Sequence, residues 1–519
     1  MASKLKTDLT KAALNNDVTA VQRLLDRGDD VNAEDNGWTP LLVAVKNANV
    51  AVVRLLLQAG ADVNWTNRKG QSALLFAVHN VDLEVVELLL QCQADVDQAH
   101  VGDGTTALYF AARSGSASLV RMLIRAGANV NLANSEGVTA LMKASDRGYY
   151  DTVRLLLNEK ADVKLVSRQG WDALMYASCE GHGKILELLL KNCDSINKEA
   201  LFIASQNGRT ECVKLLLKYG YGVNVANDEG NTALMYAAYA GHEAIAETLL
   251  KQRDINVNQQ DGNGWTALHY ASKQGKANVV QQLVKRNADV NLHSTKGVSV
   301  LMMASLSNAP GALQTLNLLL QSHADVNYVS PDGWSALGAA SFSGRHQAVE
   351  CLLQHSATDI SRSLMLAVGQ GHNTIADTLI TSGANVNFTD ESGTDPLMVA
   401  ARANNVAAVQ KLIQLGADVT KVNIEGRNAF MEAKHYGSSE VATYLDPNHT
   451  APVVAGGNRY HNNQVIINPV YNLSVVIQAP HLKNLSVKGP AVSVEAETVE
   501  NFALNGSIHV NGGDEDNDD

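Results

Sequence analysis

Thr232-Ala-Leu-Met-Tyr-Ala237 is one copy of a sequence motif that returns about every 33 residues through most of this chain. It recurs, for example, as Thr106-Ala-Leu-Tyr-Phe-Ala111 and as Thr266-Ala-Leu-His-Tyr-Ala271. A fixed period of this length indicates one small structural unit stacked many times, instead of a globule with a single core. Stacked units build long binding surfaces more readily than enclosed catalytic pockets, so the period bears on function as well as on fold.

One alanine marks the same position in every unit, and counting these alanines gives fourteen repeats: Ala12, Ala44, Ala77, Ala111, Ala144, Ala177, Ala204, Ala237, Ala271, Ala304, Ala340, Ala367, Ala400 and Ala433. Within each full unit a Gly supplies the positive φ of a tight turn, and Thr or Ser two residues later caps a helix. A second helix containing a Leu-Leu pair follows, and the unit closes with a sequence such as Gly60-Ala-Asp-Val-Asn64.

This pattern resembles the ankyrin repeat, which is a β-turn finger followed by two antiparallel helices, and the resemblance covers residues 7–446. It implies a mainly α fold, an ankyrin-repeat solenoid of about fourteen repeats. The usual His of the motif is present at His269, whereas Met stands there in seven other repeats. A flexible thioether can fill the same space in the packing.

Three repeats depart from the regular length. The gaps before Ala204 and Ala367 are 27 residues long, and both have lost the Gly-containing finger while the two helices remain. We therefore expect the finger to be missing from repeats seven and twelve. The tenth repeat is longer, with a gap of 36 residues to Ala340, and Ser307-Asn-Ala-Pro-Gly311 predicts a lengthened turn between its helices.

The C-terminal part follows a different pattern, and we divide the chain into a solenoid (1–446), a linker (447–463), a β-module (464–511) and an acidic tail (512–519). The sequence of residues 470–475 recurs at 482–487 and 499–504, with an apolar–any–Asn–apolar–small–apolar pattern. We predict a small all-β, β-helix-like module, with a β-meander as the alternative. Three coils are few for independent stability, so we expect this module to pack on the last repeat or on a copy of itself.

Composition excludes several classes of function. The net charge is −12, from 41 basic and 53 acidic residues, and no basic stripe stands out, so nucleic acid is not an expected partner. We expect no secretory signal and no membrane insertion, because no run is apolar enough. The five cysteines lack metal-ligand spacing and indicate reduced thiols in the cytoplasm. No catalytic motif was found, so we predict no enzyme activity, no cofactor and no metal.

The candidate binding residues lie in repeats eight to eleven. Trp38, Trp171, Trp265 and Trp334 each follow a finger Gly, and we expect their rings to be partly exposed. The residue two after the marker alanine is expected to face the concave groove, and it is apolar at Tyr239, Leu306 and Phe342, with Lys273 between them. We predict that Trp265, Trp334, Tyr239, Leu306, Phe342 and Lys273 bind a protein partner.

The sequence thus predicts a non-enzymatic protein-interaction scaffold. One alternative is an adaptor that presents a substrate to a separate modifying enzyme. The resemblance adds a bacterial effector that acts in a host cell as a form of this alternative. A second alternative is that the β-module has a glycan-directed activity or makes the chain self-associate into a homo-oligomer.

Overall fold

The structure is a computed structural model that describes residues 7–193, 197–446, 491–492 and 510–511. The described residues form fourteen pairs of helices, one pair for each predicted repeat, and one short strand pair. The chain divides into two compact units, Met1–Gly222 and Val223–Asp519. The first seven repeats lie in the first unit and the other seven in the second, and each unit is described by itself.

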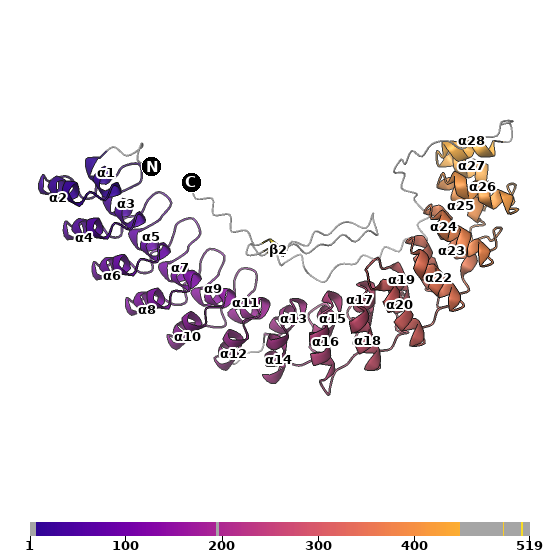
Figure 1. Cartoon of the computed structure of the whole chain (residues 1–519), viewed down its shortest axis with the longest axis horizontal. Coiled ribbons are helices and arrows are strands. Elements are labelled where there is room, and N and C mark those ends of the chain that lie inside the picture. Colours follow the sequence, from indigo (N-terminus) through magenta and orange to yellow (C-terminus); the bar gives the residue numbers. More distant parts are fainter. Residues whose placement is uncertain (1–6, 194–196, 447–490, 493–509, 512–519) are drawn as a thin grey trace. The chain divides into compact units, whose positions relative to one another are not determined.

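In the first unit the first helices of the repeats pack side by side in one row and the second helices in another (Figure 1). We call these the first row and the second row. The first row is α1 (Asp8–Leu14), α3 (Pro40–Lys46), α5 (Ala73–His79), α7 (Ala107–Ser114), α9 (Ala140–Arg147), α11 (Ala173–Glu180) and α13 (Glu199–Gln206). The second row is α2 (Val18–Asp26), α4 (Val50–Gln58), α6 (Leu83–Gln91), α8 (Ala117–Arg125), α10 (Tyr150–Asn158), α12 (Gly183–Lys191) and α14 (Thr210–Lys218).

The second unit repeats the same two-row arrangement. Its first row is α15 (Ala233–Ala240), α17 (Ala267–Lys273), α19 (Val300–Leu306), α21 (Ala336–Phe342), α23 (Ile360–Gly369), α25 (Pro396–Arg402) and α27 (Ala429–His435). Its second row is α16 (Glu243–Leu250), α18 (Ala277–Lys285), α20 (Ala312–Gln321), α22 (His346–Gln354), α24 (Asn373–Thr381), α26 (Val406–Gln414) and α28 (Ser439–Leu445).

The repeated motif forms its helix for the predicted reasons. In repeat eight the Thr232 hydroxyl accepts a hydrogen bond from the Met235 N–H, which satisfies a donor at the open start of α15. The helix ends at Gly241, whose φ of 84° lies in the left-handed region. Leu234 and Ala237 are fully or almost fully buried, so the apolar spacing of the motif is the core-facing side of the helix.

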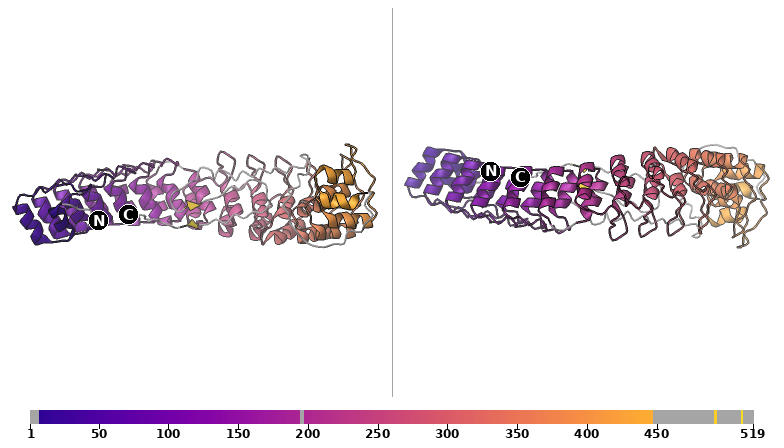
Figure 2. Two further views of the ribbon diagram at one scale, coloured as in Figure 1. Left: turned by 90° about the horizontal axis from the view of Figure 1, so that it is seen from above. Right: turned by 90° about the horizontal axis from the view of Figure 1, so that it is seen from below.

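The fingers are β-turns between the second helix of one repeat and the first helix of the next, and neighbouring fingers are joined. The Gly262 N–H donates to the Glu229 carbonyl at 2.7 Å, and the Thr295 N–H donates to the Asn263 carbonyl at 2.9 Å. In the first unit the fingers gather along one edge of the helix rows (Figure 2). Each finger is therefore held by the next one as well as by its own repeat.

A second inter-repeat link comes from the residue that closes most repeats. The Asn291 side-chain oxygen accepts from the Asp325 N–H at 2.8 Å, and its amide donates to the His323 carbonyl at 3.3 Å. Asn327 and Asn387 make the same two kinds of bond to the repeat that follows them. Because these two hydrogen bonds link each repeat to the next, Asn recurs at the end of the unit.

The predicted missing finger is confirmed in repeat twelve, where α23 begins one residue after Asp359 while both helices remain. Two side chains near the start of α23 contact the neighbouring finger instead. The Ser335 hydroxyl donates to Asp359 Oδ2 at 2.7 Å, and Arg362 Nη1 donates to the Gly333 carbonyl at 3.2 Å. In repeat seven α13 begins at Glu199, and residues 194–196 lie outside the described part of the chain.

The lengthened turn of repeat ten is also confirmed, since residues 307–311 separate α19 from α20, compared with 274–276 between α17 and α18. This turn lies directly against Gly275, where an added Cβ would be 2.7 Å from the Ala309 Cβ and 3.0 Å from the Ala312 nitrogen. Gly275 also has a positive φ of 59°, so both the close contacts and the backbone conformation exclude a side chain at this position.

The structure describes little of the C-terminal part. Two short strands, β1 (Ala491–Val492) and β2 (Val510–Asn511), pair antiparallel, with Ala491 opposite Asn511. The predicted β-helix-like module, the linker and the acidic tail otherwise lie outside the described residues.

Candidate partner-binding surface on repeats eight to eleven

Four predicted site residues lie at the ends of four consecutive first-row helices in the second unit. Tyr239 is near the end of α15, and Lys273, Leu306 and Phe342 are the last residues of α17, α19 and α21. These helices pack against one another in series, so the four positions form one line across repeats eight to eleven. Tyr239, Leu306 and Phe342 are partly exposed, whereas Lys273 is 7% exposed.

The two predicted tryptophans are not exposed, and this prediction is wrong. Trp265 is 7% exposed and Trp334 3%, and Trp171 is buried as well. The reason is that Trp stands at the base of the finger and not at its tip. The Trp265 N–H donates to Asp261 Oδ1 at 2.8 Å, and its carbonyl accepts from the Asp261 N–H at 2.9 Å. The exposed tip of this finger is formed by Gly262 and Asn263.

Each buried indole packs on the first helix of its own repeat. The Trp265 ring lies 5.3 Å from the Tyr270 ring between centroids, and the Trp334 ring stands perpendicular to Phe342 at 5.4 Å. The Trp334 indole N–H has no hydrogen-bond partner among the described residues. These rings thus support the finger and the patch from below, and only Trp38 of the four is partly exposed.

Tyr270 and Asp261 are residues that sequence reasoning missed. The Tyr270 hydroxyl donates to Asp261 Oδ2 at 2.6 Å, and burial raises the pKa of Tyr270. Asp261 thereby joins the start of the finger to the helix that follows. The same nine-residue spacing recurs where Asn227 contacts the Tyr236 hydroxyl and where Asn423 contacts Glu432, so a search for polar pairs at this spacing would have found it.

Lys273 combines burial with the lack of a counter-ion. Its Nζ lies 5.5 Å from the centroid of the Trp265 ring, an arrangement that favours the cation. No carboxylate of the described residues forms an ion pair with it, and burial lowers the pKa of Lys273 to about 8. A cation held away from water without an anion is destabilised, which is the physical reason for the lowered pKa.

Tyr239 and Leu306 extend the apolar part of the line. The Tyr239 ring meets the Tyr270 ring edge-to-face at 6.2 Å, which connects repeat eight to the buried cluster around Trp265. Leu306 immediately precedes the lengthened turn at 307–311, whose packing on Gly275 fixes the neighbouring backbone. The three partly exposed side chains are therefore held by buried aromatic rings and by a rigid turn.

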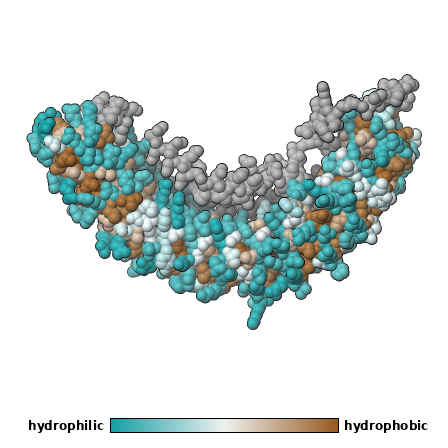
Figure 3. Space-filling view, in the orientation of Figure 1, coloured by the Kyte–Doolittle hydropathy of each residue, from teal (hydrophilic) through white to brown (hydrophobic). Residues whose placement is uncertain are grey.

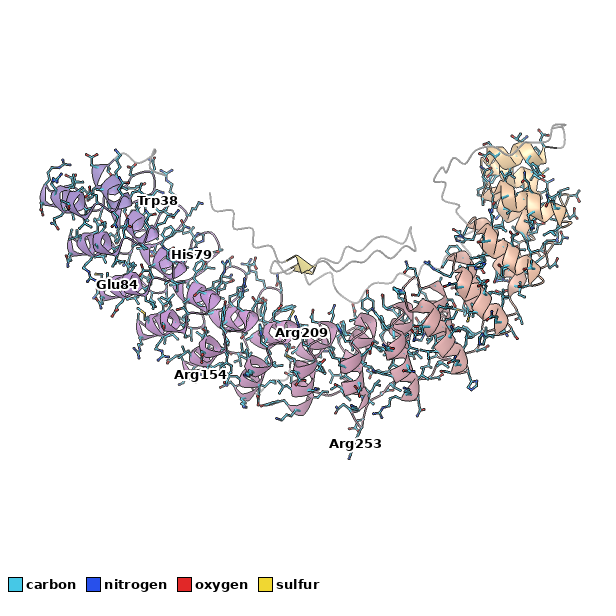
Figure 4. All side chains as sticks on the ribbon, viewed as in Figure 1. Trp38, His79, Glu84, Arg154, Arg209 and Arg253 are labelled. Atoms are coloured by element: carbon cyan, nitrogen blue, oxygen red, sulfur yellow. The ribbon has the colours of Figure 1, made fainter. Side chains whose placement is uncertain are left out.

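The first row of the first unit shows the same register with different side chains. Trp38 and His79 lie on the side of the first row, whereas Glu84 and Arg154 lie on the second row (Figure 4). The positions equivalent to Tyr239 and Phe342 are Lys46, His79, Arg113 and Asp146 in repeats two to five. An apolar line of this kind therefore distinguishes repeats eight to eleven.

A family model for ankyrin repeats matches this chain in overlapping segments that together cover residues 9–452. The chain belongs to the ankyrin repeat family. Ankyrin repeats mediate protein binding, and the fold indicates a protein–protein interaction scaffold.

Individual relatives match only short segments of this ankyrin-repeat chain. The mitochondrial disaggregase of Bos taurus is 54% identical over 57 residues, which are 11% of this chain and 8% of that protein. The 2-5A-dependent ribonuclease of Mus musculus is 47% identical over 66 residues, 12% of this chain and 9% of that protein. The matched stretches thus span under a tenth of either relative. A crystal structure of the human ASB11 ankyrin repeat domain aligns with a TM-score of 0.39 at 23% identity, covering 42% of this chain and 98% of that one.

Three titratable groups, His269 in repeat nine and the thiols of Cys179 and Cys212 in the first unit, have pKa values shifted by burial. His269 is fully buried, its Nδ1 accepts from the Thr266 N–H, and its Nε2 lies 3.3 Å from the Val298 carbonyl. Burial lowers its pKa to about 4, so it is neutral at physiological pH. Burial raises the pKa of the Cys179 thiol to about 12 and that of Cys212 to about 11, which disfavours the reactive thiolate.

No group of three or more His, Cys, Asp or Glu side chains in the described part of the chain could hold a metal ion. Among the helices of that same part, none has the length and apolar character needed to cross a membrane.

Proposed function

We propose that this chain is a non-enzymatic scaffold that binds a protein partner along the first row of repeats eight to eleven. The observation that carries the proposal is the line of partly exposed Tyr239, Leu306 and Phe342 with the uncompensated Lys273 among them. Single exposed apolar residues are common on protein surfaces, whereas aligned ones on neighbouring elements form a patch. Aromatic side chains are also enriched in interfaces.

The line sets the size and chemistry of the partner segment. Packed helices lie about 8–10 Å apart, so the three steps from α15 to α21 span about 25–30 Å. A helix of about 20 residues or an extended segment of about nine residues covers this length. The segment that fits has apolar side chains toward both ends and an acidic side chain, or a C-terminal carboxylate, that reaches Lys273.

A cytoplasmic location is part of the proposal. All five cysteines are free, which is the usual state in a reducing compartment. Burial and raised pKa values at Cys179 and Cys212 would protect these two thiols from reaction in any case.

The experiment compares matched variants by affinity capture with quantitative mass spectrometry. Leu306→Asp places a charge in the middle of the line at a partly exposed position. His79→Asp makes a similar change at the equivalent, exposed position of repeat three. We expect Leu306→Asp to reduce the amount of the main captured protein at least tenfold and His79→Asp to leave it unchanged, with the circular dichroism of both variants like that of the unchanged chain.

Lys273→Met tests the acidic contact separately, because Met fills a similar volume without the charge. Binding of a synthetic peptide from the captured protein should weaken when its acidic residue or Lys273 is neutralised, and neutralising both should add little further loss. Capture that is equal in the unchanged chain and in Leu306→Asp would rule out this line as the binding surface.

A further inference from the structure

Repeat fourteen exposes positions that most other repeats bury. The residue two before the marker alanine is at most 6% exposed in seven repeats: Met142, Met175, Met235, His269, Met302, Met365 and Met398. The contact of His269 with the Val298 carbonyl shows that this position faces the following repeat. Its counterpart in repeat fourteen is Met431, which is 47% exposed.

The second helix of repeat fourteen shows the same difference. In α26 Val409 and Leu412 are fully buried, whereas the equivalent Ala442 and Leu445 of α28 are partly exposed. Phe430 is also partly exposed, although its counterpart Leu397 is fully buried. We call Phe430, Met431, Ala442 and Leu445 the end face. Figure 3 shows hydrophobic residues among hydrophilic ones on the visible side of the second unit.

The exposure of the end face does not come from a poorly attached repeat. The Glu432 carboxylate is fully buried and accepts from Arg402 Nε at 2.8 Å, from Arg427 Nε at 2.9 Å and from Asn423 Nδ2 at 2.7 Å. Arg402 belongs to repeat thirteen, so this ion cluster joins the last two repeats. Removing one partner of such a cluster would leave a buried charge unpaired, so the two repeats are firmly connected.

The first repeat, at the other end of the repeat array, has polar side chains on its outer surface. Its helices α1 and α2 expose Lys11, Gln22, Arg23 and Asp26. A stack of repeats needs terminal units with a polar outer surface, because each repeat otherwise leaves one apolar face without a neighbour. Repeat one meets this requirement with its own side chains, and repeat fourteen does not.

The chain itself supplies a candidate for the missing neighbour. Residues 447–463 leave from the end of α28, and a 17-residue connection reaches up to about 55 Å, far more than the width of a helix pair. The segment 464–511 that follows contains apolar β-branched runs such as Val465-Ile-Ile467 and Leu473-Ser-Val-Val-Ile477. A short tether gives such a segment a local concentration in the millimolar range, which favours it over a separate molecule.

We propose that residues 464–511 dock on the end face of repeat fourteen and take the place of a following repeat. The apolar runs of the segment cover Met431 and Leu445, and the segment in turn gains the support that a few short strands lack by themselves. The inference is independent of the partner-binding surface, which lies on repeats eight to eleven.

Native lysines allow a test on the unchanged full-length chain. Lys434 is exposed on α27 with its Nζ 4.7 Å from the Phe430 ring centroid, so it lies beside the end face. Lys483 and Lys488 lie in the segment. An equal mixture of ordinary and ¹⁵N-labelled chains is treated with a lysine cross-linker. We expect links from Lys434 to Lys483 or Lys488 within single chains. Links that join an ordinary to a labelled chain would show that a second copy covers the face instead. If these lysines react with one end of the cross-linker but no link forms between Lys434 and Lys483 or Lys488, the docking is overturned.

Hydrogen exchange gives a second test with a matched control. Met431→Asp puts a charge on the end face, and Val329→Asp makes the same kind of change at an equally exposed apolar residue, 48% against 47%, elsewhere in the second unit. We expect Met431→Asp to speed exchange in 464–511 at least tenfold while exchange in α15–α22 stays unchanged, and Val329→Asp to do neither. Exchange in 464–511 that is equally fast in the unchanged chain and in Met431→Asp would contradict the proposal.

Discussion

Repeats two and nine carry the same Trp and Lys at the same spacing of eight residues, yet the two pairs differ in their surroundings. Lys46 Nζ lies 5.1 Å from the Trp38 ring centroid and Lys273 Nζ 5.5 Å from that of Trp265. Lys46 is exposed and Trp38 partly exposed, whereas Lys273 and Trp265 are each 7% exposed. An almost identical contact is thus a surface contact in one repeat and a buried one in the other.

The difference comes from residues outside the pair. Trp265 packs on Tyr270 of its own repeat, which in turn meets Tyr239 of the repeat before it. Trp38 packs on Phe76 of the next repeat, at 5.6 Å between ring centroids. A short motif therefore fixes the position of two side chains, while neighbouring repeats decide whether they are solvated.

The largest expected effect is on stability when each indole is removed. Trp265→Ala leaves a cavity in a closed aromatic cluster and should lower the free energy of unfolding by about 3–5 kcal/mol. Trp38→Ala removes a partly exposed ring and should cost about 1 kcal/mol. Urea unfolding followed by circular dichroism measures both, with hydrogen exchange in α17 as the local readout. Equal losses in the two variants would mean that the deeper burial of Trp265 adds nothing to the free energy of unfolding.

The next effect is the contribution of Lys273 to the pH dependence of stability. Burial lowers the pKa of Lys273 to about 8 from 10.5, so the unfolded chain binds more protons between these values. Lys273 should therefore contribute a rise in the free energy of unfolding of up to about 3 kcal/mol from pH 8 to 10.5, with its full destabilisation present below pH 8. The raised pKa values of Cys179 and Cys212 act in the opposite direction above about pH 9. Lys273→Met should remove this rise and Lys46→Met should keep it. A rise that is the same in both variants would assign it to other groups.

The smallest effect concerns a hydroxyl group. Trp265 packs on Tyr270, which has a hydroxyl, whereas Trp38 packs on Phe76, which has none. Tyr270→Phe leaves Asp261 Oδ2 without its 2.6 Å hydrogen bond and should cost about 1–2 kcal/mol. Because Asp261 also holds the Trp265 N–H, amide exchange at residues 262–265 should become faster. Tyr236→Phe is the control, since its hydroxyl accepts a 3.2 Å hydrogen bond from the neutral amide of Asn227 at the same nine-residue spacing. A larger loss in the control would contradict the assigned role of Asp261.

Much of the fold could be predicted because its determinants are local. Thr232 and Gly241 mark the two ends of α15 through a cap and a left-handed residue, and both act within one turn of the helix. The missing finger of repeat twelve and the added turn of repeat ten could be counted from residue spacing alone. The line formed by Tyr239, Leu306 and Phe342 followed from the same register.

Other parts of the site could not be predicted because they depend on contacts between repeats. The expectation of exposed Trp265 and Trp334 was wrong, since the finger turn starts at Asp261 or Ser330 and returns the indole to its own helix. The burial of Lys273 depends on side chains contributed by different elements and leaves no signal at a fixed spacing from the motif. The cluster around Glu432 includes the nine-residue pair with Asn423, but it also needs Arg402 of the preceding repeat.

The sequence by itself determined the unit, its number and its register, because turns, caps and apolar spacing act over a few residues. Only the tertiary structure decided which of these equivalent positions are solvated. Burial is a property of neighbours, so Lys46 and Lys273, or Met398 and Met431, share a place in the repeat and differ in what lies next to them.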